Sequence, residues 1–369
     1  MRFLEPNASC DEPPSRTERT LRVVERLVLA SGLVLLGVLF AQLGIHNVLA
    51  YLHLVGWGIV VIIAAEMLAF AANTLGWRAA FPSRIRVPSF GRLLLARIAG
   101  DSANYLTPTA NVGGEFVRVR MLQGRAAVPA LVASVMVAKL TQTIGLVVFV
   151  AVGLACDTRI PSDVRWGILA GLLLFATVLA GILAMQRRGL LAPALRLAER
   201  WAFLGFVTPL QSSIEQIDDE MARIHRESMG RIVLSSASFA LGYAAGIVES
   251  YLILWFFGIP ASLELALAIE VLGVVLNNLM FFVPARVGTQ EAGKVLVFTM
   301  LGLAPAQGLA AAVVYRIREL AWAFIGLAIL AQSRLHAPSL PSRERGSLVG
   351  SPPDPVAGLL PEELGELRE

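Results

Sequence analysis

Three charged side chains stand in the middle of an apolar stretch near the C-terminal end of the sequence. The segment AAVVYRIREL carries Arg316, Arg318 and Glu319. An ionisable group near the centre of a bilayer costs on the order of 3 kcal/mol, so such groups mark functional sites by default. Arg316 and Glu319 are three residues apart and can pair on one helix face, whereas Arg318 points elsewhere and needs another acid. The acids available to it are Glu115, Glu249, Glu270 and Glu291.

Two other segments share one pattern of proline, glycine, glutamate and a base. Residues 104–118 read NYLTPTANVGGEFVR, and residues 280–294 read MFFVPARVGTQEAGK. Proline ends a helix, glycine permits a turn, and a glutamate that opens the returning helix suits the positive end of its dipole. We therefore interpret the two segments as broken helices that form an internal repeat. The alternative is two kinked spans, with a coincidental likeness and acids near an interface.

More charged residues lie within or beside apolar stretches. Glu66 and Lys139 stand near the middle of such stretches, and Arg97 and Asp101 precede the first of the two broken segments. They either extend a polar cavity or satisfy one another in ion pairs that hold helices together. Because the charges gather around two broken helices, we favour the polar cavity.

The composition explains why these charges are unusual. The chain has 369 residues, of which 56% are hydrophobic and only 16% are charged, and its mean hydropathy is +0.69. An ordinary soluble domain has about a quarter of its residues charged. A water-soluble enzyme, a nucleic-acid binder and a disordered scaffold are therefore excluded, and the chain is predicted to be an integral membrane protein.

A helix that crosses a bilayer needs about 20 mostly apolar residues. Six stretches meet this requirement, at residues 27–44, 54–76, 128–155, 166–185, 232–258 and 306–330. The two proline-containing segments lie in further apolar regions at 91–125 and 262–304. We predict an all-α fold, a polytopic membrane helix bundle with about six full spans and two re-entrant hairpins built from broken helices.

Basic residues between these stretches predict the orientation. They are frequent at 1–26, 78–97 and 187–231 and absent from 45–53 and 259–263. This alternation predicts that both termini are cytoplasmic. The first hairpin then enters the membrane from the cytoplasmic side and the second from the opposite side, as an inverted repeat. Many transporters build their site near the bilayer midplane from such repeats.

The predicted organisation is one membrane domain between two tails. We expect residues 1–20 and 333–369 to be disordered cytoplasmic tails, because they are too polar to bury a core. Residues 21–332 form the membrane domain. Within it, the connection at about 187–230 has helical spacing of apolar residues and is predicted to form amphipathic surface helices.

Familiar catalytic and metal-binding motifs are missing from the sequence. Residues 288–294, GTQEAGK, match the first part of a phosphate-binding loop, but Val295 follows where a hydroxyl is needed for magnesium. No HExxH, paired CxxC or GxSxG motif is present. We expect no catalytic residues, no metal site, no cofactor and no nucleic-acid partner, and we do not expect an enzyme.

The residues resemble a known membrane family. The carriers of the resemblance are FFVPARVGTQEAG at 281–293, Gly-Gly-Glu115 with Arg118 and Arg120, and the arginines of the last apolar stretch. Over about residues 21–332 they resemble the lysylphosphatidylglycerol synthase transmembrane family, also called flippase-like. The GxQExG version is most similar to its hopanoid-biosynthesis-associated branch.

The resemblance implies a multi-pass protein of the bacterial inner membrane. It implies movement of a lipid between leaflets, or onward delivery of a hopanoid lipid. Relatives that transfer aminoacyl groups carry a fused soluble synthetase domain. Because this sequence ends in a short tail, we expect no aminoacyl transfer.

The leading hypothesis is therefore a lipid translocator whose headgroup site lies between the two hairpin tips. Glutamates would cap the returning helices, whose amides and nearby bases would receive an anionic or hydroxylated headgroup. A phosphate would need free bases, whereas a neutral polyol would be served by carboxylates and amides. The candidate substrate-binding residues are Asn104, Pro108, Gly113, Gly114, Glu115, Arg118, Pro284, Gly288, Gln290, Glu291, Lys294, Arg316 and Glu319.

Two alternatives stay open. The first is a membrane-embedded enzyme that modifies a lipid headgroup with Glu115 or Glu291 as general base, although only threonine hydroxyls stand nearby as nucleophiles. The second is a scaffold that recruits lipid-biosynthesis enzymes through the 187–230 connection or the C-terminal tail. The expected partners are thus a membrane lipid and, in the second case, those enzymes.

Overall fold

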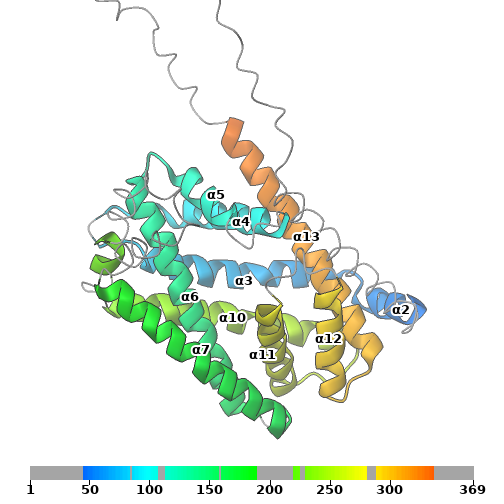
Figure 1. The fold of residues 1–369 in the computed structure, drawn as a ribbon. Helices are drawn as coiled ribbons and strands as arrows, with labels where there is room; N and C mark the ends of the chain where they lie inside the picture. Colours follow the sequence, from blue (N-terminus) through cyan, green and yellow to red (C-terminus); the bar gives the residue numbers. More distant parts are fainter. Residues whose placement is uncertain are drawn as a thin grey trace, which may run out of the picture. The chain divides into compact units, whose positions relative to one another are not determined.

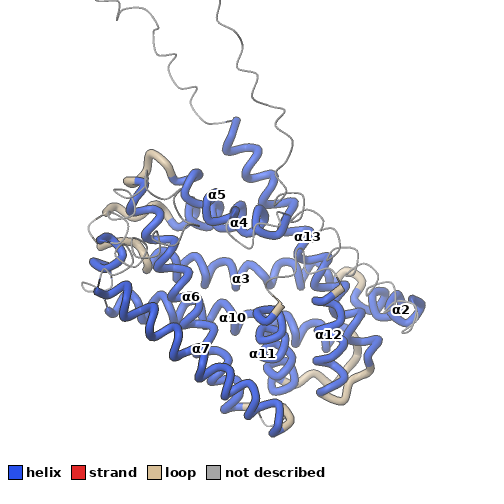
Figure 2. Tube along the Cα trace, in the orientation of Figure 1, coloured by secondary structure: helices blue, strands red, loops and turns tan. Residues whose placement is uncertain are grey.

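Helices make up the regular secondary structure in the described part of the chain, as the computed structural model shows (Figure 1, Figure 2). The described residues are 45–83, 85–106, 113–157, 159–188, 219–224, 229–280 and 288–335. The chain divides into two compact units, residues 1–330 and 331–369, and the contacts described below lie within the first. The prediction of an all-α polytopic membrane bundle is confirmed.

Four helices of the described part are long and apolar enough to cross a membrane, and they confirm four of the predicted spans. They are α3 (Gly58–Ala79), α6 (Val128–Cys156), α7 (Ser162–Arg188) and α10 (Met229–Phe256). The last helix, α13 (Pro305–Leu335), is 31 residues long, and the charges at its centre make it less apolar. The predicted span at 27–44 and most of the connection at 187–230 lie outside the described residues.

A glycine turn places the start of one span later than expected. The short helix α2 (Ile45–Val55) ends just before Gly56, which has a φ of 45°. Glycine adopts positive φ without the steric cost that a Cβ would bring. The chain therefore changes direction here, and the membrane helix begins at Gly58 instead of residue 54.

Glycines let α10 approach its neighbours α3 and α6 closely. A Cβ on Gly145 of α6 would lie 2.8 Å from backbone atoms of Ser236 and Ala240 in α10. On α3, a Cβ at Gly76 would lie 2.8 Å from the ring of Phe239. Lipid tails are as apolar as the side chains, so helices in a membrane associate through such close packing. These contacts hold the scaffold on which the polar residues are placed.

Both proline-containing segments are flanked by a pair of packed helices. The first pair is α4 (Phe90–Leu106) and α5 (Gly113–Leu122), and the second is α11 (Leu263–Leu279) and α12 (Thr289–Met300). The longest arms have 17 residues, which at 1.5 Å per residue is about 26 Å. The hydrocarbon core of a bilayer is about 30 Å thick. The arms of 17 residues are therefore at the lower limit for a span, and α5 and α12, with 10 and 12 residues, are too short to cross it alone. Pro108 and Pro284 themselves lie outside the described residues.

We expect Gly145→Ala to lower the free energy of unfolding by about 1–3 kcal/mol, because the new methyl group meets the backbone of α10. Gly171→Ala on α7 is the matched control, since nothing lies within 4 Å of a Cβ there. Helix propensity alone makes the control neutral or stabilising by up to about 1 kcal/mol. Thermal unfolding in detergent, followed by circular dichroism, measures both. Equal melting temperatures for the two variants would contradict this packing.

Candidate functional site

Arg316 lies at the point where the two hairpins meet α13. Its Nη2 and Nε atoms donate to Oε1 of Glu291 on α12, at 2.7 and 3.1 Å. Its Nη1 donates to the hydroxyl of Tyr105 on α4, at 3.0 Å. Glu319, the partner expected from the sequence, lies farther away at 3.7 Å. One guanidinium therefore contacts an arm of each hairpin.

Glu291 is positioned by the backbone as well as by Arg316. Its Oε2 accepts a hydrogen bond of 2.8 Å from the N–H of Gly288, where α12 begins. Gly288 has a φ of 78°, which a residue with a Cβ rarely adopts. The side chain is only 5% exposed. Glu291 thus caps its own helix with one oxygen and orients Arg316 with the other.

Arg318 connects α13 to two membrane-spanning helices. Its Nη1 donates to Oε2 of Glu66 on α3 at 2.8 Å and also to Oε2 of Glu249 on α10. Arg318 therefore does have the further acid that its position required. Glu249 was among the acids expected for it, whereas Glu66 was grouped with charges of undetermined role.

Gln290 completes a polar network on α13. Its amide Nε2 donates to Oε1 of Glu319 at 2.9 Å. Two consecutive residues of α12, Gln290 and Glu291, therefore contact Glu319 and Arg316 of the last helix. We call this network the α13 charge cluster. Its members are Glu66, Glu249, Gln290, Glu291, Arg316, Arg318 and Glu319.

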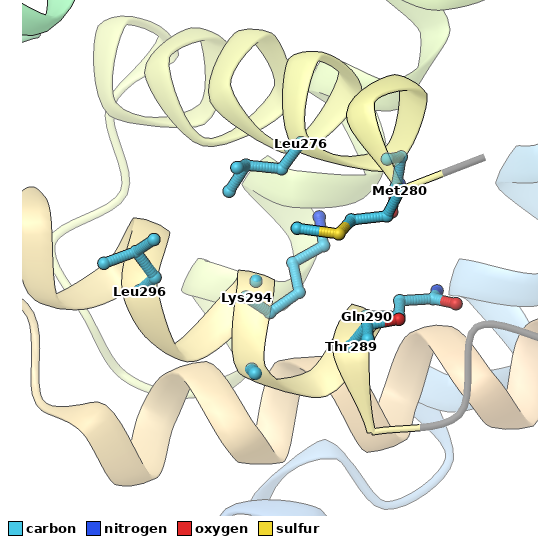
Figure 3. Close-up of a pocket in the computed structure, with 10 residues that line it drawn as sticks. Leu276, Met280, Thr289, Gln290, Lys294 and Leu296 are labelled. Atoms are coloured by element: carbon cyan, nitrogen blue, oxygen red, sulfur yellow. The ribbon is translucent and has the colours of Figure 1, made fainter. Parts of the chain in front are cut away.

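Lys294 is buried next to this cluster but takes no part in its ion pairs. The side chain is 5% exposed, and its Nζ lies 3.8 Å from the centre of the Tyr315 ring. Figure 3 shows it directed from α12 toward α11, close to Met280. It lines a cavity of about 220 Å³ between these helices, together with Gln290 and Asn277.

A second group of charges belongs to the first hairpin. Arg118 of α5 donates to Glu115 of the same helix and to Asp101 of α4. Asp101 also lies 3.6 Å from Arg97, and Glu115 accepts from Lys139 of α6 at 3.0 Å. These charges satisfy one another, so Arg118 does not contact the α13 charge cluster.

A close backbone contact supports this hairpin. The amide N–H of Gly114 donates to Oδ1 of Asn104 at 2.6 Å. A Cβ on Gly114 would lie 2.1 Å from the carbonyl oxygen of Gly100, so glycine is required where α5 starts along α4. Gly113 is the first residue of α5. The candidates thus divide into two groups, linked through the bond between Tyr105 and Arg316.

Three uncharged hydroxyls were missed by the sequence analysis. Tyr105 bonds to Arg316, and the hydroxyls of Tyr315 and Ser250 lie 2.8 Å apart. Tyr315 directly precedes Arg316, and Ser250 directly follows Glu249, so each was adjacent to a charge already identified. Tyr105 carried no such signal except its position before a break.

Some polar atoms in the site retain capacity for hydrogen bonding. Oε1 of Glu249 and Oε2 of Glu319 are buried without a hydrogen-bond partner in the described structure. Within the described ranges, no three His, Cys, Asp or Glu side chains are arranged to hold a metal ion. The arrangement can therefore offer carboxylate oxygens, arginine donors and a buried amine to a polar group.

Membrane-length helices with paired charges at their centres define a multi-pass membrane protein. Residues 23–327 match the family model described as the lysylphosphatidylglycerol synthase TM region, and the chain belongs to this family. No curated protein and no solved structure matches the chain. Membership relates it to membrane proteins of lipid modification or translocation.

We expect Arg318→Met to lower the free energy of unfolding by about 3–5 kcal/mol, because the buried carboxylate of Glu249 and the half-buried one of Glu66 lose their base. Replacing Glu66 and Glu249 by Leu in the same chain should recover most of that loss. Arg159→Met is the control: its ion pair with Glu264 spans 3.5 Å between side chains that are 45% and 64% exposed, and such pairs contribute about 0–1 kcal/mol. Chemical unfolding in detergent tests this. An Arg318→Met protein as stable as the Arg159→Met protein would contradict it.

Proposed function

We propose that this protein is a lipid translocator of the bacterial cytoplasmic membrane. Its substrate is a lipid with a polar headgroup, such as a hopanoid or a phospholipid, which it moves between leaflets or delivers onward. Family membership supports a role with membrane lipids. The single observation that carries the proposal is the position of Arg316, which bonds to Tyr105 of the first hairpin and Glu291 of the second.

The bonds of Arg316 to these two partners differ in strength. Two hydrogen bonds join the guanidinium to the carboxylate of Glu291, where both groups are charged, whereas one joins it to the neutral hydroxyl of Tyr105. The contact between opposite charges is the stronger one. A phosphate or hydroxyl oxygen that enters between the hairpins displaces the tyrosine first. Glu291 keeps the guanidinium oriented while Nη1 binds the headgroup. Release of Tyr105 then removes one of the bonds between α4 and α13, while the hydroxyl of Ser102 keeps its bond to the carbonyl of Trp322.

The hairpins provide the path in this proposal. They enter from opposite sides as an inverted repeat, and both termini are cytoplasmic. Such repeats allow one half of a transporter to move against the other around a fixed site. The short arms of α4, α5, α11 and α12 support this arrangement. Irregular backbone between arms is tolerated at membrane depth where it lines a cavity.

We expect Arg316→Ala and Glu291→Gln to slow lipid movement about tenfold or more, since each removes a charge-assisted bond worth about 1.5–3 kcal/mol. Purified protein in phospholipid vesicles with a fluorescent lipid, read by leaflet-resolved quenching, measures the rate. Arg159→Ala, which alters an exposed ion pair, should match the unaltered protein. If folded Arg316→Ala moves lipid as fast as the control, the site assignment is wrong. A changed headgroup in the recovered lipid, detected by mass spectrometry, would favour the lipid-modifying enzyme instead.

The proposed topology is tested by cysteine labelling. Cys156 is an exposed free thiol at the end of α6, which the topology places outside the cytoplasm. In a Cys10→Ser background we expect a membrane-impermeant maleimide to label it in intact spheroplasts. A Cys156→Ser chain, which retains Cys10, should be labelled only after lysis. The reverse pattern would overturn the orientation.

A further inference from the structure

Glu270 of α11 is an acid at membrane depth that no base reaches. Its Oε2 accepts a hydrogen bond of 3.2 Å from the hydroxyl of Ser250 on α10. No Lys, Arg or His nitrogen of the described residues lies within 4 Å of its carboxylate. An uncompensated carboxylate in such surroundings is costly, and it is stabilised by a proton or by a base that moves to it.

The space around Glu270 decides which group can stabilise its carboxylate. A Cβ on Gly246 of α10 would lie 2.3 Å from Oε1 of Glu270, so the carboxylate is pressed against the backbone of α10. A lipid headgroup does not fit between them. A proton does, and it can reach the carboxyl group along a chain of hydroxyls.

Two hydroxyls form this chain. The hydroxyl of Ser250 lies 3.2 Å from Oε2 of Glu270 and 2.8 Å from the hydroxyl of Tyr315, and either hydroxyl of the second pair can be the donor. The chain thus connects Tyr315 through Ser250 to the carboxyl oxygen. Tyr315 is also the residue whose ring faces the amine of Lys294. Among the described residues, Glu270 has no base and Lys294 has no acid at ion-pair distance. These two residues therefore lie at the two ends of the chain formed by Ser250 and Tyr315.

Lys294 has room to move toward Glu270. Its Nζ lies 3.1 Å from the position of a Cβ on Gly273, one helical turn after Glu270 on the same face of α11. The cavity of about 220 Å³ that Lys294 lines is large enough for several waters. Lys294 thus lies between this cavity and the hydroxyl chain.

The other charged groups near the pair already have partners. Arg318 is shared by Glu66 and Glu249, and Glu319 accepts from Gln290. The titratable and charged groups that face the pair are Glu66 on α3, Glu249 on α10, and Tyr315, Arg318 and Glu319 on α13. Among these residues Lys294 is the base left for Glu270.

We propose that Glu270 and Lys294 form a proton-operated latch between the arms of the second hairpin. In one state Glu270 carries a proton and Lys294 stays over the Tyr315 ring. When the O–H bond of the acid breaks and the proton passes to water, the carboxylate draws Lys294 into an ion pair across α11 and α12. This inference rests on the proposed lipid movement, which the latch couples to the proton gradient.

Infrared spectroscopy tests the proton site without any transport. In a pH titration of the purified protein, a component of the carboxylic-acid C=O band should vanish as the pH is raised. Glu270→Gln should lack this component. Glu264→Gln, which alters a 64% exposed carboxylate of the same helix, should keep it. In Lys294→Met the component should persist to more alkaline pH, because the carboxylate loses its base. A titrating component that survives in Glu270→Gln overturns the proposal.

Vesicles with an imposed pH gradient test the coupling. One pH unit can change the rate of fluorescent lipid movement by at most about tenfold for each coupled proton. We expect the unaltered protein and Glu264→Gln to respond to the gradient and Glu270→Gln not to respond. A response in Glu270→Gln equal to that of the control overturns the coupling.

The two proposals fail in different ways. If the unaltered protein moves no lipid but its infrared component belongs to Glu270, the proton site stands and the proposed function falls. If Glu270→Gln does not fold, Lys294→Met carries the test. An infrared component with the same titration in Lys294→Met as in the unaltered protein then overturns the latch.

Discussion

Arg316 and Arg318 at the centre of α13 must be neutralised where they lie, because an unpaired charge is costly at membrane depth. Arg318 meets this constraint with Glu66 of α3 and Glu249 of α10. Arg316 meets it with Glu291 of α12, and a tyrosine of α4 accepts a further bond. A guanidinium offers five donors in one plane, so each arginine joins several helices at once. The charge pairing therefore links the hairpins and the spans to α13.

The close helix packing and the polar network depend on each other. Glycines of α10 leave space that polar side chains fill: Gly242 lies against Asn73 of α3, and Gly246 lies against Glu270 of α11. With a side chain at position 246 in place of the glycine, the carboxylate of Glu270 could not reach Ser250. The same close approach excludes larger ligands from Glu270. The site next to Arg316, where a headgroup can replace the neutral hydroxyl of Tyr105, and the latch at Glu270, where only a proton fits, therefore differ in what they can bind.

Much of the fold could be predicted because it follows from local patterns. Runs of apolar residues predicted the spans that became α3, α6, α7 and α10, and the proline and glycine pattern predicted the end of α11, which falls at Leu279. The start of α3 was wrong by four residues because the conformation of Gly56 is a property of the folded turn. The role of Glu66 was undetermined because a single acid within a span can pair with any helix that packs against it.

Residue types and spacing alone determine that this chain needs a membrane, that it contains two broken helices and that charges lie at depth in its last helix. They do so because hydropathy, helix breaking and charge are local properties of the chain. Only the tertiary structure decides which charges pair: Arg118 pairs within its own hairpin, Arg316 pairs with Glu291, and Lys294 has no ion pair among the described residues. The physical reason is that pairing depends on distances of a few ångströms between helices far apart in sequence, and close contacts at glycines set those distances.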